Sequence, residues 1–236
     1  MSKLPLLVSV PHAGLDVPEE LRARNLLDPD EIAADGDTGA AELYRPLACE
    51  VQAFVTARVA RAFVDLNRPE HDRRLDGVVK THTCWQRPIY AEPLDEELIE
   101  RLLERYHRPY HAQLVEAAAG AALGLDCHTM AAYGPPVGPD EGKRRPFICV
   151  GDGEGACPAE WAEAMAELLS EAFDERVTVN EPFAGGHITR ARPGGIPWMQ
   201  LELRRGDPQR YGFKSRKLLA TLKKFCAQVL QPARSA

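Results

Sequence analysis

Long apolar runs are missing from this sequence. No stretch approaches the roughly 20 apolar residues that a membrane-spanning helix requires. Residues 1–7 carry one cation and a short apolar run that Pro5 interrupts, without the longer apolar segment and small-residue cleavage site of a signal peptide. We therefore expect a cytoplasmic protein with no membrane partner.

Positive charge and cysteine pairs are scarce as well. The 29 Lys and Arg residues against 35 Asp and Glu residues leave a net charge of -6, which argues against nucleic-acid binding through a general positive field. The six cysteines form no C-x-x-C pair and no zinc-finger spacing, so we expect mostly buried thiols. The glycines match neither G-x-G-x-x-G nor G-x-x-x-x-G-K-[ST], which gives no sign of a phosphate-binding loop. A small-molecule partner is favoured.

The remaining composition is that of an ordinary globular protein, with 44% hydrophobic and 27% charged residues. Without an internal repeat or a linker, residues 1–236 are expected to form a single domain. Short apolar runs predict strands at 4–10, 54–59, 62–66, 121–130, 147–150, 177–179 and 197–203. Amphipathic patterns predict helices at 17–25, 28–34, 40–52, 94–119, 158–173 and 215–230. Strands and helices alternate, so we predict an α/β fold.

The stretch Leu125-Asp126-Cys127-His128-Thr129-Met130 ends one of these strands. Ligands bind at the carboxyl ends of strands in open α/β sheets. Asp126 and His128 are two residues apart and share a face, which suits an imidazole metal ligand supported by a carboxylate. Cys127 should face the other way and be structural. The alternative is a loop histidine that bonds to its acidic neighbour.

Two further groups follow the same logic near the N-terminus. His12 comes directly after the first strand and is followed by small residues, a placement typical of a site residue, although an ordinary loop histidine is as good an interpretation. Asp37 lies in the turn-forming cluster 35–39. It either caps the next helix or serves as a third metal ligand.

Candidate substrate-binding and catalytic groups come from later segments. Arg68 can hold a carboxylate with its planar fork, and Asn67 offers an amide beside it. Arg190, after paired glycines, is a second candidate for the same role. Surface or structural ion pairs explain both arginines equally well. Glu202 lies in an otherwise apolar strand, where a carboxylate is costly unless it is paired or used as a general base.

A histidine pair in the long predicted helix and a long loop before that helix also bear on the site. His107 and His111 are four residues apart in a helix that Pro109 should disturb, and because no H-E-x-x-H motif is present we favour hydrogen bonding over zinc binding. The long segment 70–93, which contains Trp85 and Tyr90, is predicted to be a folded lid.

Together these motifs resemble the N-formylglutamate amidohydrolase family over about residues 8–204, in the family's order. The motifs are Pro11-His12-Ala13-Gly14, Asp35-Gly36-Asp37, Asp65-Leu66-Asn67-Arg68, 106–111, Asp126-Cys127-His128-Thr129, 185–190 and Gln200-Leu201-Glu202-Leu203. The resemblance implies a fold similar to that of zinc carboxypeptidases (phosphorylase/hydrolase-like): a mixed sheet with helices on both faces and one zinc ion at the strand ends.

The resemblance also implies roles for these residues. It assigns His12, Asp37 and His128 as zinc ligands, Asp126 as their support, Glu202 as the base, and Asn67, Arg68 and Arg190 as carboxylate-binding groups. Asp35 is the alternative to Asp37, and another divalent metal is the alternative to zinc.

The implied reaction is hydrolysis of an N-acyl amino acid, best represented by N-formyl-L-glutamate giving formate and L-glutamate in histidine degradation. The alternatives are a zinc carboxypeptidase-like enzyme or another N-acyl amino acid deacylase, and a non-catalytic carboxylate-binding relative.

Overall fold

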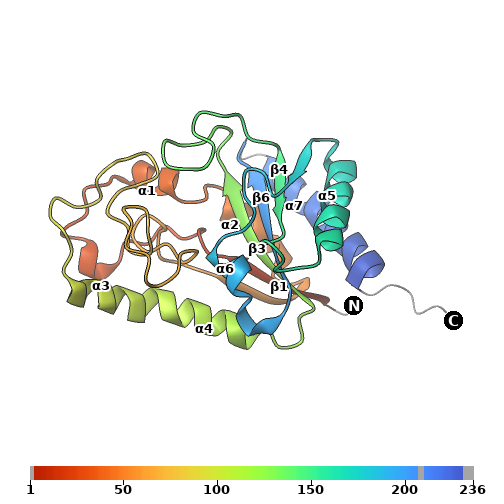
Figure 1. Ribbon diagram of the computed structural model, residues 1–236, viewed down its shortest axis with the longest axis horizontal. Coiled ribbons are helices and arrows are strands. Elements are labelled where there is room, and N and C mark those ends of the chain that lie inside the picture. Colours follow the sequence, from red (N-terminus) through yellow and green to blue (C-terminus); the bar gives the residue numbers. More distant parts are fainter. Residues whose placement is uncertain (1–2, 207–209, 231–236) are drawn as a thin grey trace.

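Six strands form one mixed sheet in the computed structural model, which describes residues 3–206 and 210–230 (Figure 1). The strand order is β2-β1-β3-β6-β4-β5. The strands are β1 (Leu4–Val10), β2 (Val51–Thr56), β3 (Leu123–Met130), β4 (Ile148–Gly151), β5 (Val177–Val179) and β6 (Trp198–Arg204). The first four strands in this order run parallel, whereas β4 is antiparallel to β6 and parallel to β5. The α/β fold with a mixed sheet is confirmed.

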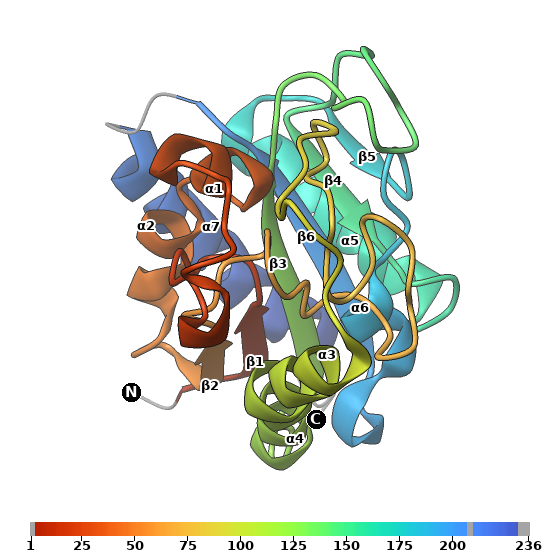
Figure 2. The same cartoon turned by 90° about the vertical axis from the view of Figure 1, so that its left-hand side faces the viewer.

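Helices cover both faces of this sheet (Figures 1 and 2). On one side lie α2 (Ala40–Tyr44), α5 (Ala159–Phe173) and α7 (Tyr211–Phe225), over a core that includes Leu125, Cys127 and Leu201. On the other side lie α3 (Glu96–Leu102) and α4 (Arg108–Ala117), over a second core that includes Trp198. The period-2 alternation of β3 and β6 sends Leu125, Cys127 and Leu201 to the first core, and Asp126, His128, Gln200 and Glu202, together with Trp198, to the opposite face.

The predicted helix over 94–119 is present, with a change of geometry in its middle. Asp95 caps it by accepting a hydrogen bond of 2.8 Å from the backbone N–H of Leu98. A π-helical turn, Leu103–His107, joins α3 to α4 just before Pro109. Proline has no N–H to donate to the preceding turn, and the wider turn accommodates that loss.

Several predicted elements were wrong in extent. The helix expected over 40–52 ends at Tyr44, a 3-10 turn (Arg45–Leu47) containing Pro46 follows, and β2 already begins at Val51. The strand expected over 62–66 is reduced to an isolated bridge between Val64 and Val79. The helix expected over 17–25 is a 3-10 turn, Glu19–Leu21, and the short helix α6 (His187–Ala191) was not predicted. The prediction of one domain over 1–236 extends beyond the described ranges and stays a prediction.

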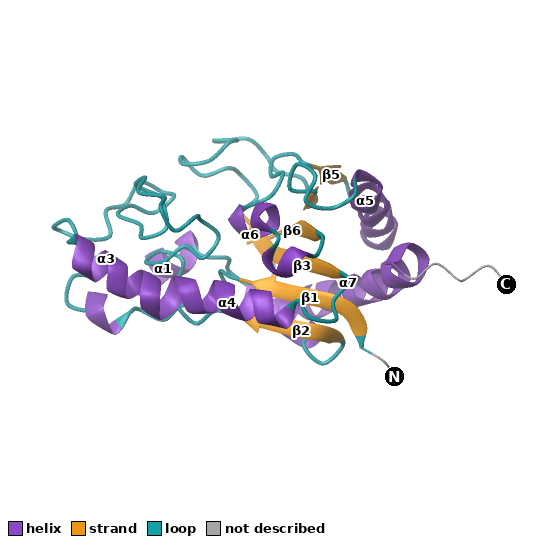
Figure 3. Cartoon of the chain, turned by 60° about the horizontal axis from the view of Figure 1, so that its bottom comes forward, coloured by secondary structure: helices purple, strands orange, loops and turns teal. Residues whose placement is uncertain are grey.

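Loops gather at the end of the sheet toward which β1 and β2 point (Figure 3). The connection over 57–95 contributes most of them and contains no helix or regular strand. It is nevertheless anchored, since Phe63, Val78 and Ile89 are fully buried in the second core. No helix within residues 3–206 or 210–230 combines the length and apolar character needed to cross a membrane.

Candidate metal centre and its pocket

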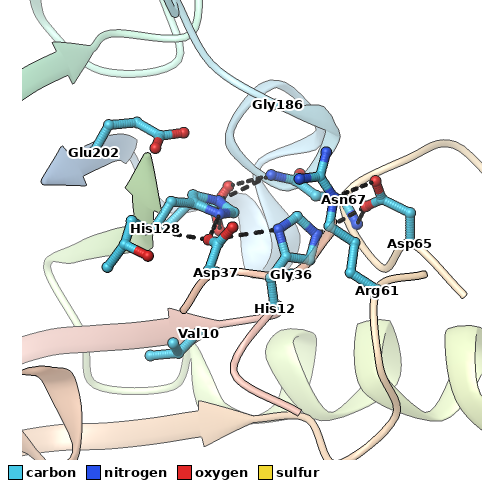
Figure 4. A network of polar contacts seen from close by, with 12 residues as sticks. Val10, His12, Gly36, Asp37, Arg61, Asp65, Asn67, His128, Gly186 and Glu202 are labelled. Atoms are coloured by element: carbon cyan, nitrogen blue, oxygen red, sulfur yellow. Dashed lines mark hydrogen bonds and ion pairs between the residues drawn. The ribbon is translucent and has the colours of Figure 1, made fainter. Parts of the chain in front are cut away.

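Three buried side chains from distant segments converge beyond the carboxyl end of β1 (Figure 4). His12 follows β1, Asp37 lies between α1 (Pro29–Asp35) and α2, and His128 lies in β3. Oδ2 of Asp37 is 2.9 Å from Nδ1 of His128 and 3.6 Å from Nδ1 of His12. One potential ligand atom from each residue lies within 4.8 Å of the others. Two imidazole nitrogens and one carboxylate oxygen are a donor set that zinc accepts.

The ring of His12 shows why a cation fits here. Its Nε2 atom lies 2.8 Å from Oδ1 of Asp65, a fully buried carboxylate. Its Nδ1 atom is buried and has no hydrogen-bond partner among the residues that the structure describes. When Nε2 carries the proton for Asp65, Nδ1 presents a lone pair toward Asp37, as a metal ligand would.

Asp65 was not among the predicted site residues. Its signal in the sequence was an acidic residue near the end of an apolar run, two residues before Asn67. Besides His12, it pairs with Arg61 at 3.0 Å. Burial alone would raise the pKa of Asp65, but His12, Arg61 and Arg68 hold it well below its usual value.

The ring of His128 is held by a second network. Its Nε2 atom lies 3.1 Å from Oδ1 of Asp126. The amide of Asn67 donates to the other Asp126 oxygen at 2.9 Å and accepts from the backbone N–H of Ile188 at 2.8 Å. Both polar atoms of Asn67 are thus engaged inside the protein. Gly186 lies so close that a Cβ atom there would be 2.2 Å from the Asn67 amide nitrogen.

The two acidic residues of the 35–37 turn have different surroundings. The Asp35 carboxylate lies 2.7 Å from Nζ of Lys80 and accepts a 2.6 Å hydrogen bond from the backbone N–H of Cys84. Burial alone would raise the pKa of Asp35, but Lys80 and Arg61 lower it. The Asp37 carboxylate does not cap α2 and instead contacts the two imidazoles, which hold its pKa well below the usual value against the effect of burial.

Glu202 lies in β6 directly opposite His128 in β3. Its carboxylate lies on the His128 side of β6 (Figure 4). It accepts a 2.9 Å hydrogen bond from the amide of Gln200. Burial, reinforced by the charge of Asp37, raises the pKa of Glu202 to about 7 in spite of the opposing effect of His128. A carboxylate with this pKa can take up and release a proton near neutral pH.

These residues line a pocket of about 310 Å³. Six cationic side chains reach it: Arg61, Arg68, Lys80, Arg145, Arg190 and Arg205. Four acidic ones do so: Asp35, Asp37, Asp76 and Glu202. In a chain whose net charge is -6, this local excess of positive charge suits an anionic ligand.

The predicted carboxylate-binding arginines both line the pocket, each with a partner at its rim. Arg68 lies 3.4 Å from Asp76, and Arg190 lies 2.9 Å from Glu154. Arg145 was not predicted. It is buried, makes a two-bond contact with Asp140 at 2.7 and 2.8 Å, and lies over the ring of Phe183.

The predicted supporting residues behave as expected. Nε2 of His107 lies 2.9 Å from the carbonyl oxygen of Arg68, and Nε2 of His111 lies 2.9 Å from that of Leu66. The two rings thus hold the backbone on both sides of Asn67, which confirms a hydrogen-bonding role. Cys127 is fully buried in the core on the opposite face of β3, as predicted.

Comparison with known proteins agrees with this geometry. The sequence profile described as N-formylglutamate amidohydrolase matches residues 4–206. The chain belongs to the N-formylglutamate amidohydrolase family. This confirms the resemblance drawn from the motifs.

Relatives and solved structures extend the match within the family. The N-formylglutamate deformylase of Pseudomonas putida is 33% identical over 205 residues, which are 80% of this chain and 74% of that protein. The N-formylglutamate deformylase of Pseudomonas aeruginosa is 30% identical over 203 residues, with the same coverage. The crystal structure of N-formylglutamate amidohydrolase from Ralstonia eutropha JMP134 has the same fold, with a TM-score of 0.78 at 22% identity over 96% of this chain and 94% of the other.

Proposed function

We propose that this chain hydrolyses the amide bond of N-formyl-L-glutamate to formate and L-glutamate with one divalent metal ion, preferably zinc. His12, Asp37 and His128 would hold the ion. The observation that carries the proposal is the buried Nδ1 atom of His12, which has no hydrogen-bond partner within residues 3–206 and 210–230 and faces Asp37 and His128 beside a cationic pocket. The named activity of the two Pseudomonas relatives supports this substrate.

Glu202 would move the proton that the reaction requires. An ion bound at the three ligands supplies Lewis-acid chemistry, which acidifies water and polarises a carbonyl group. Glu202 accepts one proton from the attacking water molecule and delivers it to the amide nitrogen as the C–N bond breaks. One water molecule is consumed, and the second proton, released as formic acid ionises, protonates the amine, so the products are formate and an ammonium group.

The pocket would select the substrate by charge and size. Arg68 and Arg190 are proposed to bind the two carboxylates of N-formyl-L-glutamate. Asn67 lines the same pocket, and because its amide is already engaged we propose that it orients Asp126 and His128 beside the substrate. A volume of about 310 Å³ is at the small end of ligand pockets, about 300–1,000 Å³, which favours an N-acyl amino acid over a long peptide. The cytoplasmic location and the role in histidine degradation belong to the same proposal.

The test measures bound metal and formate release together. The purified protein should contain one metal ion and release formate from N-formyl-L-glutamate. His128→Ala should lose both properties, whereas Glu202→Gln should keep the metal and lose turnover. Formate release that survives a chelator and both substitutions would overturn the mechanism.

A substrate panel separates the alternatives. Formyl-, acetyl- and succinyl-amino acids and short peptides are compared at equal concentration. Preference for acetyl or succinyl substrates would identify a different deacylase. Metal and glutamate binding without turnover of any substrate would identify a non-catalytic relative.

A further inference from the structure

A buried ion pair joins the turn that carries Asp37 to the long connection over 57–95. Nζ of Lys80 lies 2.7 Å from one carboxylate oxygen of Asp35, and the backbone N–H of Cys84 donates to the other at 2.6 Å. Asp35 is two residues from Asp37. The connection over 57–95 therefore binds the turn two residues before Asp37, a proposed metal ligand.

Two arginine side chains also bind backbone carbonyl groups of the same turn. Nη1 of Arg61 lies 3.3 Å from the carbonyl oxygen of Asp35. The guanidinium of Arg205, just past β6, donates to the carbonyl oxygen of Gly36. Three cationic side chains thus bind the turn, two from the connection over 57–95 and one from just past β6, and Lys80 is the one that is fully buried.

Lys80 is itself firmly placed. Its backbone N–H donates to the carbonyl oxygen of Phe63 at 3.3 Å, and it follows the bridge between Val64 and Val79. Phe63 and Val64 belong to the second core. The ammonium group is therefore presented from a core-anchored position rather than from a freely moving loop.

Stability alone is a weak reason for this pair. A buried ion pair is often no more stabilising than apolar residues of similar volume, because both charges lose their hydration. The pair does specify how the two loops lie against each other. One oxygen of the Asp35 carboxylate binds Nζ of Lys80, and the other accepts from the backbone N–H of Cys84. Because Asp35 is held in place, the orientation of the following side chains of the turn, including Asp37, is restricted as well.

We propose that Lys80 is a positioning residue for the metal centre: through Asp35 it holds the turn in the conformation that presents Asp37 to His12 and His128. The inference rests on the proposed role of Asp37 as a metal ligand. Lys80 and Cys84 also line the substrate pocket, so the same contact ties the pocket wall to the metal ligands.

The first test is Lys80→Met, which keeps the length of the side chain and removes its charge. The zinc dissociation constant is measured by competition with a chelating dye, and the free energy of unfolding is measured separately on the metal-free protein. Residues that support metal ligands typically contribute about 10- to 100-fold in affinity, and we expect a loss in this range.

The matched control is Lys217→Met. Lys217 donates to the carbonyl oxygen of Ala172 at 2.6 Å and links α7 to α5, outside the pocket. The Lys217→Met substitution should change the unfolding free energy without changing zinc affinity. Zinc affinity in Lys80→Met equal to that of the parent would overturn the proposal, whatever the change in stability.

A double variant covers the case in which Lys80→Met does not fold. Asp35→Asn with Lys80→Met removes both charges and keeps both shapes, and such neutral pairs are usually tolerated. Weakened zinc binding in the folded double variant supports the proposal, and parental affinity refutes it. Asp37→Asn separates this outcome from the proposed function: unchanged zinc affinity there would remove Asp37 from the ligand set, independently of Lys80.

Discussion

Nε2 of His12 lies 2.8 Å from Oδ1 of Asp65, and this contact turns Nδ1 of the same ring toward Asp37. At His128, by contrast, Nδ1 lies 2.9 Å from Asp37, while Nε2 lies 3.1 Å from the amide nitrogen of Asn67 and 3.1 Å from Oδ1 of Asp126. A carboxylate behind an imidazole selects the tautomer that leaves the other nitrogen free for a metal ion. The ring of His12 is oriented in this way.

Asp65→Asn should therefore weaken metal binding. The asparagine has the same shape but no charge with which to orient His12, so we expect zinc affinity to fall about 10- to 100-fold. Competition with a chelating dye measures the change. Asp16→Asn serves as the control, because Asp16 is exposed and pairs with exposed Arg58. Equal zinc affinity in Asp65→Asn and the parent would contradict the role of this carboxylate.

The pH dependence of turnover should report Glu202. Burial raises the pKa of its carboxyl group to about 7. A protonated carboxyl cannot accept a proton, so kcat/KM should fall as pH decreases through this pKa. A bound cation favours the carboxylate and should move the acidic limb below pH 7. The residual activity of Glu202→Gln should lack this limb, and an unchanged limb in that variant would exclude Glu202 as its source.

Gly186→Ala should disturb the site through Asn67. The added Cβ atom would lie 2.2 Å from the Asn67 amide nitrogen, so Asn67 must move away from Asp126. We expect a loss of about 1–3 kcal/mol in unfolding free energy, together with reduced formate release. Denaturant titration and activity assays measure the two effects.

Gly212→Ala is the matched control for that substitution. A Cβ atom at Gly212, in α7, would lie 3.6 Å from the guanidinium of Arg216, an ordinary van der Waals distance, and alanine favours a helix over glycine by about 0.5–1 kcal/mol. Unchanged or higher stability is expected there. Parental activity and stability in Gly186→Ala would show that the close approach to Asn67 is unimportant.

His111 should make the metal-free protein less stable in acid. Burial, with the nearby His107, lowers the pKa of His111 to about 4, whereas an unfolded histidine has a pKa of about 6.5. Between these values the unfolded chain binds the proton more readily, so this residue reduces the unfolding free energy by up to about 1.4 kcal/mol per pH unit as pH falls.

The comparison variant is His111→Gln, which retains a donor for the Leu66 carbonyl group but does not titrate. Unfolding free energies measured by denaturant titration across this pH range should fall less steeply in the variant than in the parent. His71→Gln, at an exposed position, should follow the parent. Equal slopes for parent and His111→Gln would refute the prediction.

Local sequence patterns predicted the parts of the fold that depend on nearest neighbours. The apolar run at Leu4–Val10 corresponds to β1, and the caps and amphipathic patterns placed α3, α4 and α5. The failures occurred where tertiary contacts override local preference. The valine- and phenylalanine-rich segment 62–66 has strand composition, but in the part of the chain that the structure describes its one bridging partner is Val79.

By itself, the sequence determined that Asp126 and His128 share one face of a strand, that Gln200 and Glu202 share one face of another, and that Cys127 points away, because side chains in strands alternate with a period of two. Only the tertiary structure decided which distant groups meet. The β1–β3–β6 register brings together residues far apart in the chain, such as His12 just after β1, His128 in β3 and Glu202 in β6. The tertiary structure also separates the surroundings of Asp35 and Asp37: Asp35 pairs with the buried ammonium of Lys80, whereas Asp37 contacts the imidazoles. Such pairings depend on how loops pack in space, which short-range patterns in the chain do not encode.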